Sequence, residues 1–245
     1  MNRILLIETA TDVCSVAIAE GEQILSAEHI PDARSQASRL APMIQNVLKK
    51  TDTQVHRLAA VAVSSGPGSY TGLRVGVSTA KGICFGAGIP LIGIETLTII
   101  ANGALKDDAV KNGPENTLIV PMTDARRMEV YTALYDITGN RITKTAAIVL
   151  TPDTFSEELE RYSRIVFTGD GAAKYEAMIP EKYRDKCIVL PSHPDAEYMA
   201  APAFQALQEK RFEDTAYFEP FYLKEFIAAD PSRKLEAVLH PDRHL

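Results

Sequence analysis

The stretch that decides the fold of this chain reads Ser64-Ser65-Gly66-Pro67-Gly68-Ser69-Tyr70-Thr71-Gly72-Leu73-Arg74. It follows an apolar run at residues 58–63 and precedes a segment with helical spacing. A buried strand, a glycine-rich turn and a helix start are typical of α/β proteins that present backbone N–H groups to a ligand. The same turn also serves ordinary strand-to-helix geometry.

The glycine-rich loop lacks the chemistry that would make it a known catalytic motif. No lysine follows at the spacing of a phosphate-binding P-loop, and no G-x-S-x-G pattern makes Ser69 a nucleophile. Glycine permits backbone angles closed to other residues, proline stiffens the turn, and a hydroxyl can cap the helix. We therefore interpret the loop as structural, with these residues as its members: Gly66, Pro67, Gly68, Ser69, Thr71 and Gly72.

Composition places the chain among ordinary globular proteins. Of its 245 residues, 46% are hydrophobic and 24% charged, enough for one large domain or two smaller ones. A net charge of −6 argues against unaided nucleic-acid binding. Cys14, Cys84 and Cys187 are widely spaced and predict reduced core thiols. The apolar run at residues 4–7 is too short for a signal peptide, and no segment approaches the length of a membrane span. We therefore expect a cytoplasmic protein that does not bind a membrane.

The two halves of the chain repeat one pattern. In the first half, strands are predicted at 4–8, 14–19, 23–28, 58–63 and 91–94, with helices at 35–50, 71–87 and 97–104. After a polar linker, the second half shows strands at 118–122, 128–135, 141–148, 164–168 and 188–190, with helices at 153–162, 172–179 and 196–212. Each half opens with three strands, of which the first is the most apolar.

This repetition predicts a duplicated α/β unit of the actin/hexokinase/Hsp70 (ASKHA) class. Each unit would be a β-meander with crossover helices, and the expected division is 1–104, 117–227 and a polar tail at 228–245. In that superfamily the first turns of the two units hold a phosphate ligand in a cleft between them. Fold alone does not fix function.

Four motifs carry a resemblance to a known family. They are Ile7-Glu8-Thr9-Ala10-Thr11, the glycine-rich stretch at 66–74, Asp124-Ala125-Arg126 with Glu129-Val130-Tyr131, and Pro220 with Tyr222-Leu223-Lys224. In this order they resemble the TsaB (YeaZ) family, a subunit of the bacterial machinery that makes threonylcarbamoyladenosine in tRNA. The resemblance is dense from Arg3 to about Tyr135 and thinner afterwards.

The resemblance implies support for threonylcarbamoyl transfer to the adenosine beside the anticodon, on tRNAs reading codons that begin with adenine. It implies a non-catalytic subunit that forms a heterodimer with a TsaD-like catalytic subunit and works with a TsaE-like ATPase. It also implies contact with tRNA only through the complex, and a homodimer when the chain is alone. TsaD holds a metal through a His-x-x-x-His pair, whereas residues 89–100 here contain no histidine, and Glu95 alone cannot hold a metal. We therefore expect no metal, no cofactor and no catalytic residue.

The carboxylates Glu8, Asp12 and Asp124 lie at the two first turns, where a phosphotransferase would place metal-holding or base groups. Neither turn carries glycines that would admit a phosphate, so turn chemistry is favoured. Glu8 also departs from the family, which commonly has aspartate there. Asp124-Ala125-Arg126 is either an intersubunit contact or a local salt-bridged turn. Of the histidines, only His240 and His244 have metal-ligand spacing, and we interpret them as surface tail.

Small residues recur along the predicted helix at 71–87. Gly72, Gly76 and Ala80 form a smooth stripe that suits either packing on the chain's own sheet or docking to another subunit. The resemblance implies that a partner docks on the helices at 35–50 and 71–87. From their spacing, we expect these interface residues: Met43, Val47, Arg74, Val75 and Ser78.

Two other functions are alternatives to a non-catalytic subunit that supports a TsaD-like enzyme. A small-molecule kinase of the same superfamily would bind ATP and magnesium when isolated. A metallopeptidase of the glycoprotease type would carry a metal. The missing phosphate loop disfavours the first, and the missing metal ligands disfavour the second.

Overall fold

The computed structural model describes residues 2–30 and 36–223. The predicted polar tail, with His240 and His244, lies outside the described residues, as do Ser35 and Lys224. No helix in the described ranges is long and apolar enough to cross a membrane.

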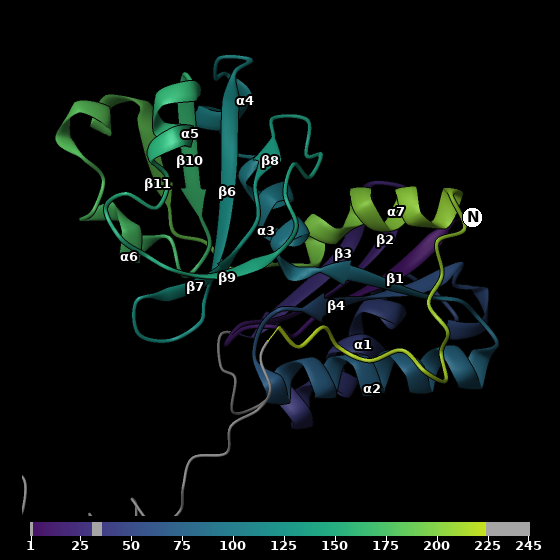
Figure 1. Ribbon diagram of the computed structural model, residues 1–245. Coiled ribbons are helices and arrows are strands. Elements are labelled where there is room, and N and C mark those ends of the chain that lie inside the picture. The colour runs from purple at the N-terminus through teal and green to yellow at the C-terminus, as the bar shows by residue number, and fades with distance from the viewer. Residues whose placement is uncertain (1, 31–35, 224–245) are drawn as a thin grey trace, which may run out of the picture.

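Two sheets with the same strand order form the frame of the molecule (Figure 1). The first has the order β3-β2-β1-β4-β5, and the second the order β11-β10-β6-β7-β9 with β8 paired to β6. In both sheets three antiparallel strands are followed by two that run parallel to the first. The predicted duplicated α/β unit of the ASKHA class is therefore confirmed. The strands are β1 Arg3–Glu8, β2 Cys14–Glu20, β3 Gln23–Ile30, β4 Ala60–Gly66, β5 Leu91–Glu95, β6 Thr117–Asp124, β7 Glu129–Thr132, β8 Tyr135–Asp136, β9 Ala146–Val149, β10 Arg164–Thr168 and β11 Cys187–Leu190.

Helices cover both faces of the first sheet. In the described residues the helices of both units are α1 Gln36–Lys50, α2 Tyr70–Ala87, α3 Thr96–Ala104, α4 Asp108–Lys111, α5 Ser156–Arg161, α6 Ala173–Glu176 and α7 Ala200–Gln208, with 3₁₀ helices η2 Val55–Arg57, η3 Glu181–Lys186 and η4 Ala196–Met199. Figure 1 shows α1 and α2 on one face, and α3 and α7 on the other. Side chains alternate along a strand, so Leu5 and Ile7 pack in the cluster with α1 and α2, while Ile4 and Leu6 pack in the cluster with α7. Because both faces are covered, β1 is apolar nearly throughout.

The C-terminal part of the chain returns to the first sheet. Buried alanines and a methionine of η4 and α7 pack against Ile4 and Leu6, in one cluster with residues of β2, β4 and β5. Further on, Glu213 N donates to Leu91 O at 2.9 Å. The predicted boundary at 117–227 is therefore wrong, because the chain after β11 belongs by packing to the first unit. The predicted helix at 196–212 is also shorter, since it begins as η4 and ends at Gln208, before Lys210 adopts a left-handed φ of 54°.

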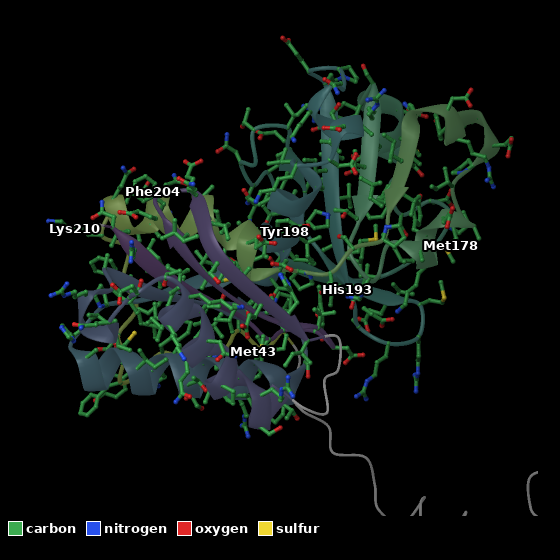
Figure 2. All side chains as sticks on the ribbon, turned by 180° about the vertical axis from the view of Figure 1, so that it is seen from behind. Met43, Met178, His193, Tyr198, Phe204 and Lys210 are labelled. Atoms are coloured by element: carbon green, nitrogen blue, oxygen red, sulfur yellow. The ribbon has the colours of Figure 1, made fainter. Side chains whose placement is uncertain are left out.

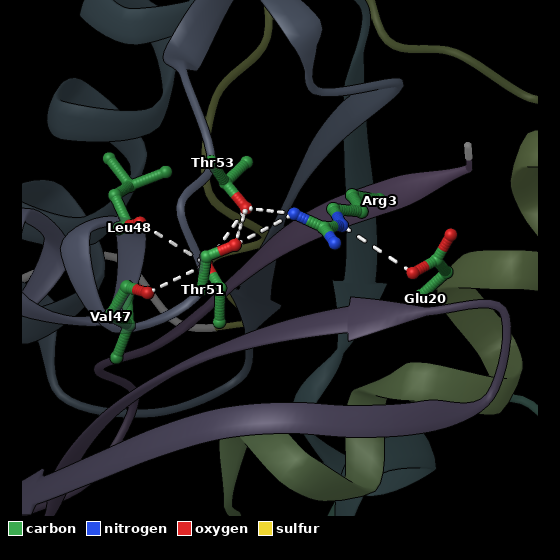
Figure 3. A network of polar contacts seen from close by, with 6 residues as sticks. All are labelled: Arg3, Glu20, Val47, Leu48, Thr51 and Thr53. Carbon is green, nitrogen blue, oxygen red and sulfur yellow. Dashed lines mark hydrogen bonds and ion pairs between the residues drawn. The ribbon is translucent and has the colours of Figure 1, made fainter.

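A polar network anchors the end of α1 to the first strand (Figure 3). Arg3 Nη1 donates to Thr51 O at 2.8 Å and to Thr53 Oγ1 at 2.7 Å. Thr51 Oγ1 in turn donates to Val47 O at 2.8 Å, which satisfies a carbonyl at the helix C-terminus. The opposite side of the guanidinium meets Glu20 at 3.5 Å. The network fixes where α1 ends and thereby how its apolar face meets the sheet.

Candidate functional site

The first turn of the N-terminal unit bonds its backbone N–H groups to side chains of the same chain. Glu8 ends β1 and is fully buried, and its Oε1 accepts from Ala10 N at 2.5 Å. Thr9 N donates to Ser64 Oγ at 3.2 Å. Burial raises the pKa of Glu8 to about 8, so its carboxyl group is mostly protonated at neutral pH. A neutral, enclosed carboxyl group cannot hold Mg²⁺ or act as a solvent-facing base.

The glycine-rich loop lies directly on this turn. Ser69 N donates to Ala10 O at 2.6 Å, and a Cβ added at Gly68 would lie 2.9 Å from Ala10 Cβ and nearer still to Ala10 O. Only a residue without a side chain permits that approach. Ser69 Oγ accepts from Gly72 N at 3.3 Å, which confirms the predicted cap of the following helix. The parallel pairing of β1 with β4 brings the turn and the loop together.

The returning C-terminal segment covers the other side of the loop. Phe221 N donates to Ser65 O at 2.7 Å, and a Cβ at Gly66 would lie 2.7 Å from Phe221 O. Gly66 has a φ of 105° and precedes Pro67 through a cis peptide bond. Of the other loop residues, Thr71 is exposed and Gly72 is buried. The loop is thus enclosed by two backbone segments of its own chain.

The first turn of the second unit is a locally bonded turn. Asp124 Oδ1 accepts from Arg126 N at 2.5 Å and pairs with Lys174 Nζ at 2.7 Å. Arg126 and Arg127 follow with positive φ values of 71° and 51°, and both are exposed. Of the two predicted readings of Asp124-Ala125-Arg126, the geometry matches the local salt-bridged turn, although the partner is Lys174 rather than Arg126.

Glu95 is held by an arginine of the second unit. Its Oε2 pairs with Arg141 Nη2 at 2.6 Å, its Oε1 accepts from Nη1 at 2.7 Å, and Thr145 Oγ1 donates to Oε2 at 2.8 Å. A bidentate guanidinium–carboxylate ion pair is a strong contact with a fixed orientation. This carboxylate therefore ties the two units together. Asp12, the remaining predicted turn carboxylate, is exposed.

Two of the five predicted interface residues are wrong. Met43 and Val47 are 3% and 0% exposed and belong to the core between α1, α2 and the first sheet, so neither side chain is available to a partner. Figure 2 labels Met43 in the helical layer of this half. Apolar residues at helical spacing mark a buried face, and here that face meets the chain's own sheet. Val75 is half-buried against the same core, whereas Arg74 and Ser78 are exposed.

The small-residue stripe divides into a buried and an exposed part. Gly72, Gly76 and Ala80 are buried, and a Cβ at Gly76 would collide with the Thr9 side chain, so this stripe packs on the chain itself. Gly82 and Gly86 instead are exposed, and the space beside each is open. Each costs the helix about 1 kcal/mol relative to alanine.

Phe85 lies beside these open glycines and is 87% exposed. It shares a helix face with Ser78, seven residues earlier. Phe85 is not among the residues predicted from the sequence, because one phenylalanine in an apolar helix gives no sign of which way it points. Arg74, about three helical turns earlier on α2, has its guanidinium 4.0 Å from the Tyr70 ring centroid, and its Nε donates to Tyr222 Oη at 3.4 Å.

Sequence comparison identifies the family of this chain. It is 35% identical over 233 residues to the tRNA threonylcarbamoyladenosine biosynthesis protein TsaB of Escherichia coli (strain K12), a match that spans 92% of this chain and 96% of the relative. The chain belongs to the TsaB family. A second relative with the same name, from Bacillus subtilis (strain 168), is 28% identical, and the match spans 90% of this chain and 93% of the relative.

Other comparisons agree with membership of the TsaB family. The profile described as "TsaD: tRNA N6-adenosine threonylcarbamoyltransferase" matches residues 30–230. A crystal structure titled as an uncharacterized protein with similarity to peptidase YEAZ, from Pseudomonas aeruginosa, superimposes with a TM-score of 0.76 at 25% identity, over 91% of this chain and 100% of that one. The structure titled YeaZ from Pseudomonas aeruginosa gives 0.75 at 24% identity over the same shares, which supports the fold. The predicted TsaB resemblance is confirmed.

Proposed function

We propose that this chain is a non-catalytic subunit in the biosynthesis of threonylcarbamoyladenosine in tRNA, and that it docks on and supports a TsaD-like catalytic subunit. Its relatives are named for this pathway. The observation that carries the non-catalytic role is the closed first turn, where Glu8 bonds to Ala10 N and Ser69 N bonds to Ala10 O.

The closed turn removes the groups that a nucleotide would need. Phosphate binding at such a turn requires backbone N–H groups that point toward the ligand. Here Ala10 N and Thr9 N both donate to side chains of the same chain. The net charge of −6 also disfavours direct binding of this chain to the tRNA phosphates. We therefore assign tRNA binding to the assembled complex, in the cytoplasm.

The outer face of α2 is the surface that we assign to the partner. Phe85 is a large apolar side chain that α2 leaves in water, and Gly82 and Gly86 beside it weaken the helix without any neighbour in the described chain that requires them. A partner helix that packs closely on this face would bury Phe85 and use the space beside the glycines. Ser78 and Arg74 extend the same face. A TsaE-like ATPase would join this assembly, and without a partner the same face would support a homodimer.

Association of purified subunits tests the docking surface. We expect calorimetry with a TsaD-like subunit to show binding that Phe85→Ala weakens at least tenfold and Gly82→Arg abolishes. The matched control is Gln208→Arg, an exposed position of α7 on the opposite face of the sheet, which should bind normally. Unchanged binding by both α2 variants would contradict the assigned surface.

A further inference from the structure

We propose that His29, Asp195 and Glu197 form a binding site for a divalent transition-metal ion of the zinc class. A metal ion bound there would link β3 to the start of η4. It shares no residue with the closed first turn or with the outer face of α2, and it does not depend on the proposed role in tRNA modification.

Three ligand atoms of these residues converge. One nitrogen of His29 and one carboxylate oxygen from each acid all lie within 4.8 Å of one another. His29 Nδ1 is 2.8 Å from Asp195 Oδ2, and His29 Nε2 is 3.8 Å from Glu197 Oε2. Two ligand atoms that are each about 2 Å from one zinc ion lie about 3–4 Å apart, so the observed spacing is close to that of an occupied site but not equal to it. Coordination of one ion would require both carboxylates to lie near a single ring nitrogen, because Asp195 is now closest to Nδ1 and Glu197 to Nε2.

The acidic half of the site is held in place before any ion binds. Asp195 Oδ1 accepts from Glu197 N at 2.8 Å, which orients the carboxylate and leaves Oδ2 toward His29. Ala196 N donates to Ser15 Oγ of β2 at 2.8 Å inside the protein. Ala196 and Met199 are both fully buried, so the start of η4 is fastened to the sheet that carries His29. A preformed ligand frame lowers the ordering cost of metal binding.

The donor set selects the class of ion. One imidazole with two carboxylates suits zinc and neighbouring first-row metals, whereas magnesium and calcium prefer oxygen ligands alone. The three side chains are 42%, 18% and 38% exposed, so an ion can enter and a water can complete the coordination. Two carboxylates facing one imidazole also leave local negative charge that a dication would offset. Lys106 reaches the Glu197 carbonyl at 3.2 Å rather than its carboxylate.

The proposed metal site lies near the place where the two halves of the molecule meet. Tyr198 follows Glu197 directly, stacks under Lys106 at 5.1 Å and packs closely on Gly103 of α3. Figure 2 shows Tyr198 between the two halves of the molecule. An ion held by Glu197 would therefore stabilise the segment that packs on α3 and on the first sheet. No local sequence pattern indicates the site, because His29 and Asp195 are far apart along the chain.

Metal titration of the full chain tests the proposal. The background variant His240→Asn/His244→Asn removes the histidine pair of the tail, so that only binding elsewhere is measured. We expect one Zn²⁺ per chain in competition with a chromophoric chelator, and a thermal midpoint that rises by about 5–10 °C at a hundredfold excess over the dissociation constant. Co²⁺ at the same site should give visible absorption bands of a low-coordinate complex.

The ligand variants decide the outcome. His29→Asn, Asp195→Asn and Glu197→Gln should each weaken Zn²⁺ binding at least tenfold, and Asn at 195 keeps the backbone cap. The control His56→Asn removes an exposed histidine of η2 and should bind normally. Glu197→Gln removes a ligand but not the His29–Asp195 pair, so it remains informative if the other variants are unstable. Zn²⁺ binding that all three variants retain, or no saturable binding by the background protein, would overturn the proposal.

Discussion

The contact between the glycine-rich loop and the first turn predicts that Gly68→Ala is strongly destabilising. The added methyl group would lie 2.9 Å from Ala10 Cβ and 3.0 Å from its carbonyl carbon, with the carbonyl oxygen closer still. These are backbone atoms and a Cβ, so no side-chain rotation relieves the overlap. The loop would have to move away from the turn.

The magnitude follows from what that movement disrupts. Overpacking of this kind costs about 1–3 kcal/mol. Separation of the loop from the turn also breaks the bond from Ser69 N to Ala10 O, worth about 1 kcal/mol. We therefore expect Gly68→Ala to lower the free energy of unfolding by about 2–4 kcal/mol.

Urea unfolding followed by circular dichroism measures the loss, with Gly82→Ala as the matched control. Gly82 lies inside α2 with open space beside it, so alanine there should stabilise the isolated chain by about 1 kcal/mol. The same substitution should weaken association with a TsaD-like subunit. Equal or greater stability of Gly68→Ala relative to the natural chain would refute the argument that the loop closes the turn.

Three further predictions concern buried or paired charges. Because the pKa of Glu8 is about 8 in the folded chain and lower when unfolded, the unfolded state releases this proton first, and stability falls as pH rises from about 5 to 8, by up to about 1.4 kcal/mol per pH unit. Glu8→Gln should flatten that slope in urea unfolding at several pH values, and an unchanged slope would contradict the assignment. Arg141→Met leaves the half-buried Glu95 without its main partner and should cost about 1–3 kcal/mol; calorimetry that shows an unchanged thermal midpoint would argue against this link between the units. Arg3→Met removes the donor to Thr53 and should cost about 1–2 kcal/mol and speed hydrogen exchange at the end of α1, whereas unaltered exchange there would count against the anchor.

The sequence predicted the repeated strand pattern and the capped loop well, because both depend on local chemistry. Strand alternation, glycine at a tight turn and a hydroxyl at a helix start act within a few residues. The path of the chain after β11 is different, since an apolar helix such as α7 can cover either sheet. Helix α7 packs on Ile4 and Leu6, on the face of the first sheet opposite α1 and α2.

The interface residues show the same limit in the candidate site. Met43 and Val47 have the helical spacing of a packing face, but spacing does not say whether the face meets the chain's own sheet or a partner. Phe85 is distinguished by its exposure, which helical spacing does not predict. The convergence of His29 with Asp195 likewise depends on how β3 and η4 meet, which no short-range pattern records.

Transfer of a labelled threonylcarbamoyl group to tRNA is the most direct measure of the claim that this chain supports chemistry without performing it. With a TsaD-like subunit and a TsaE-like ATPase present, we expect product only when this chain is added, and its Phe85→Ala variant should support less. Modified tRNA formed by this chain alone, or full activity of the partner without it, would contradict the account.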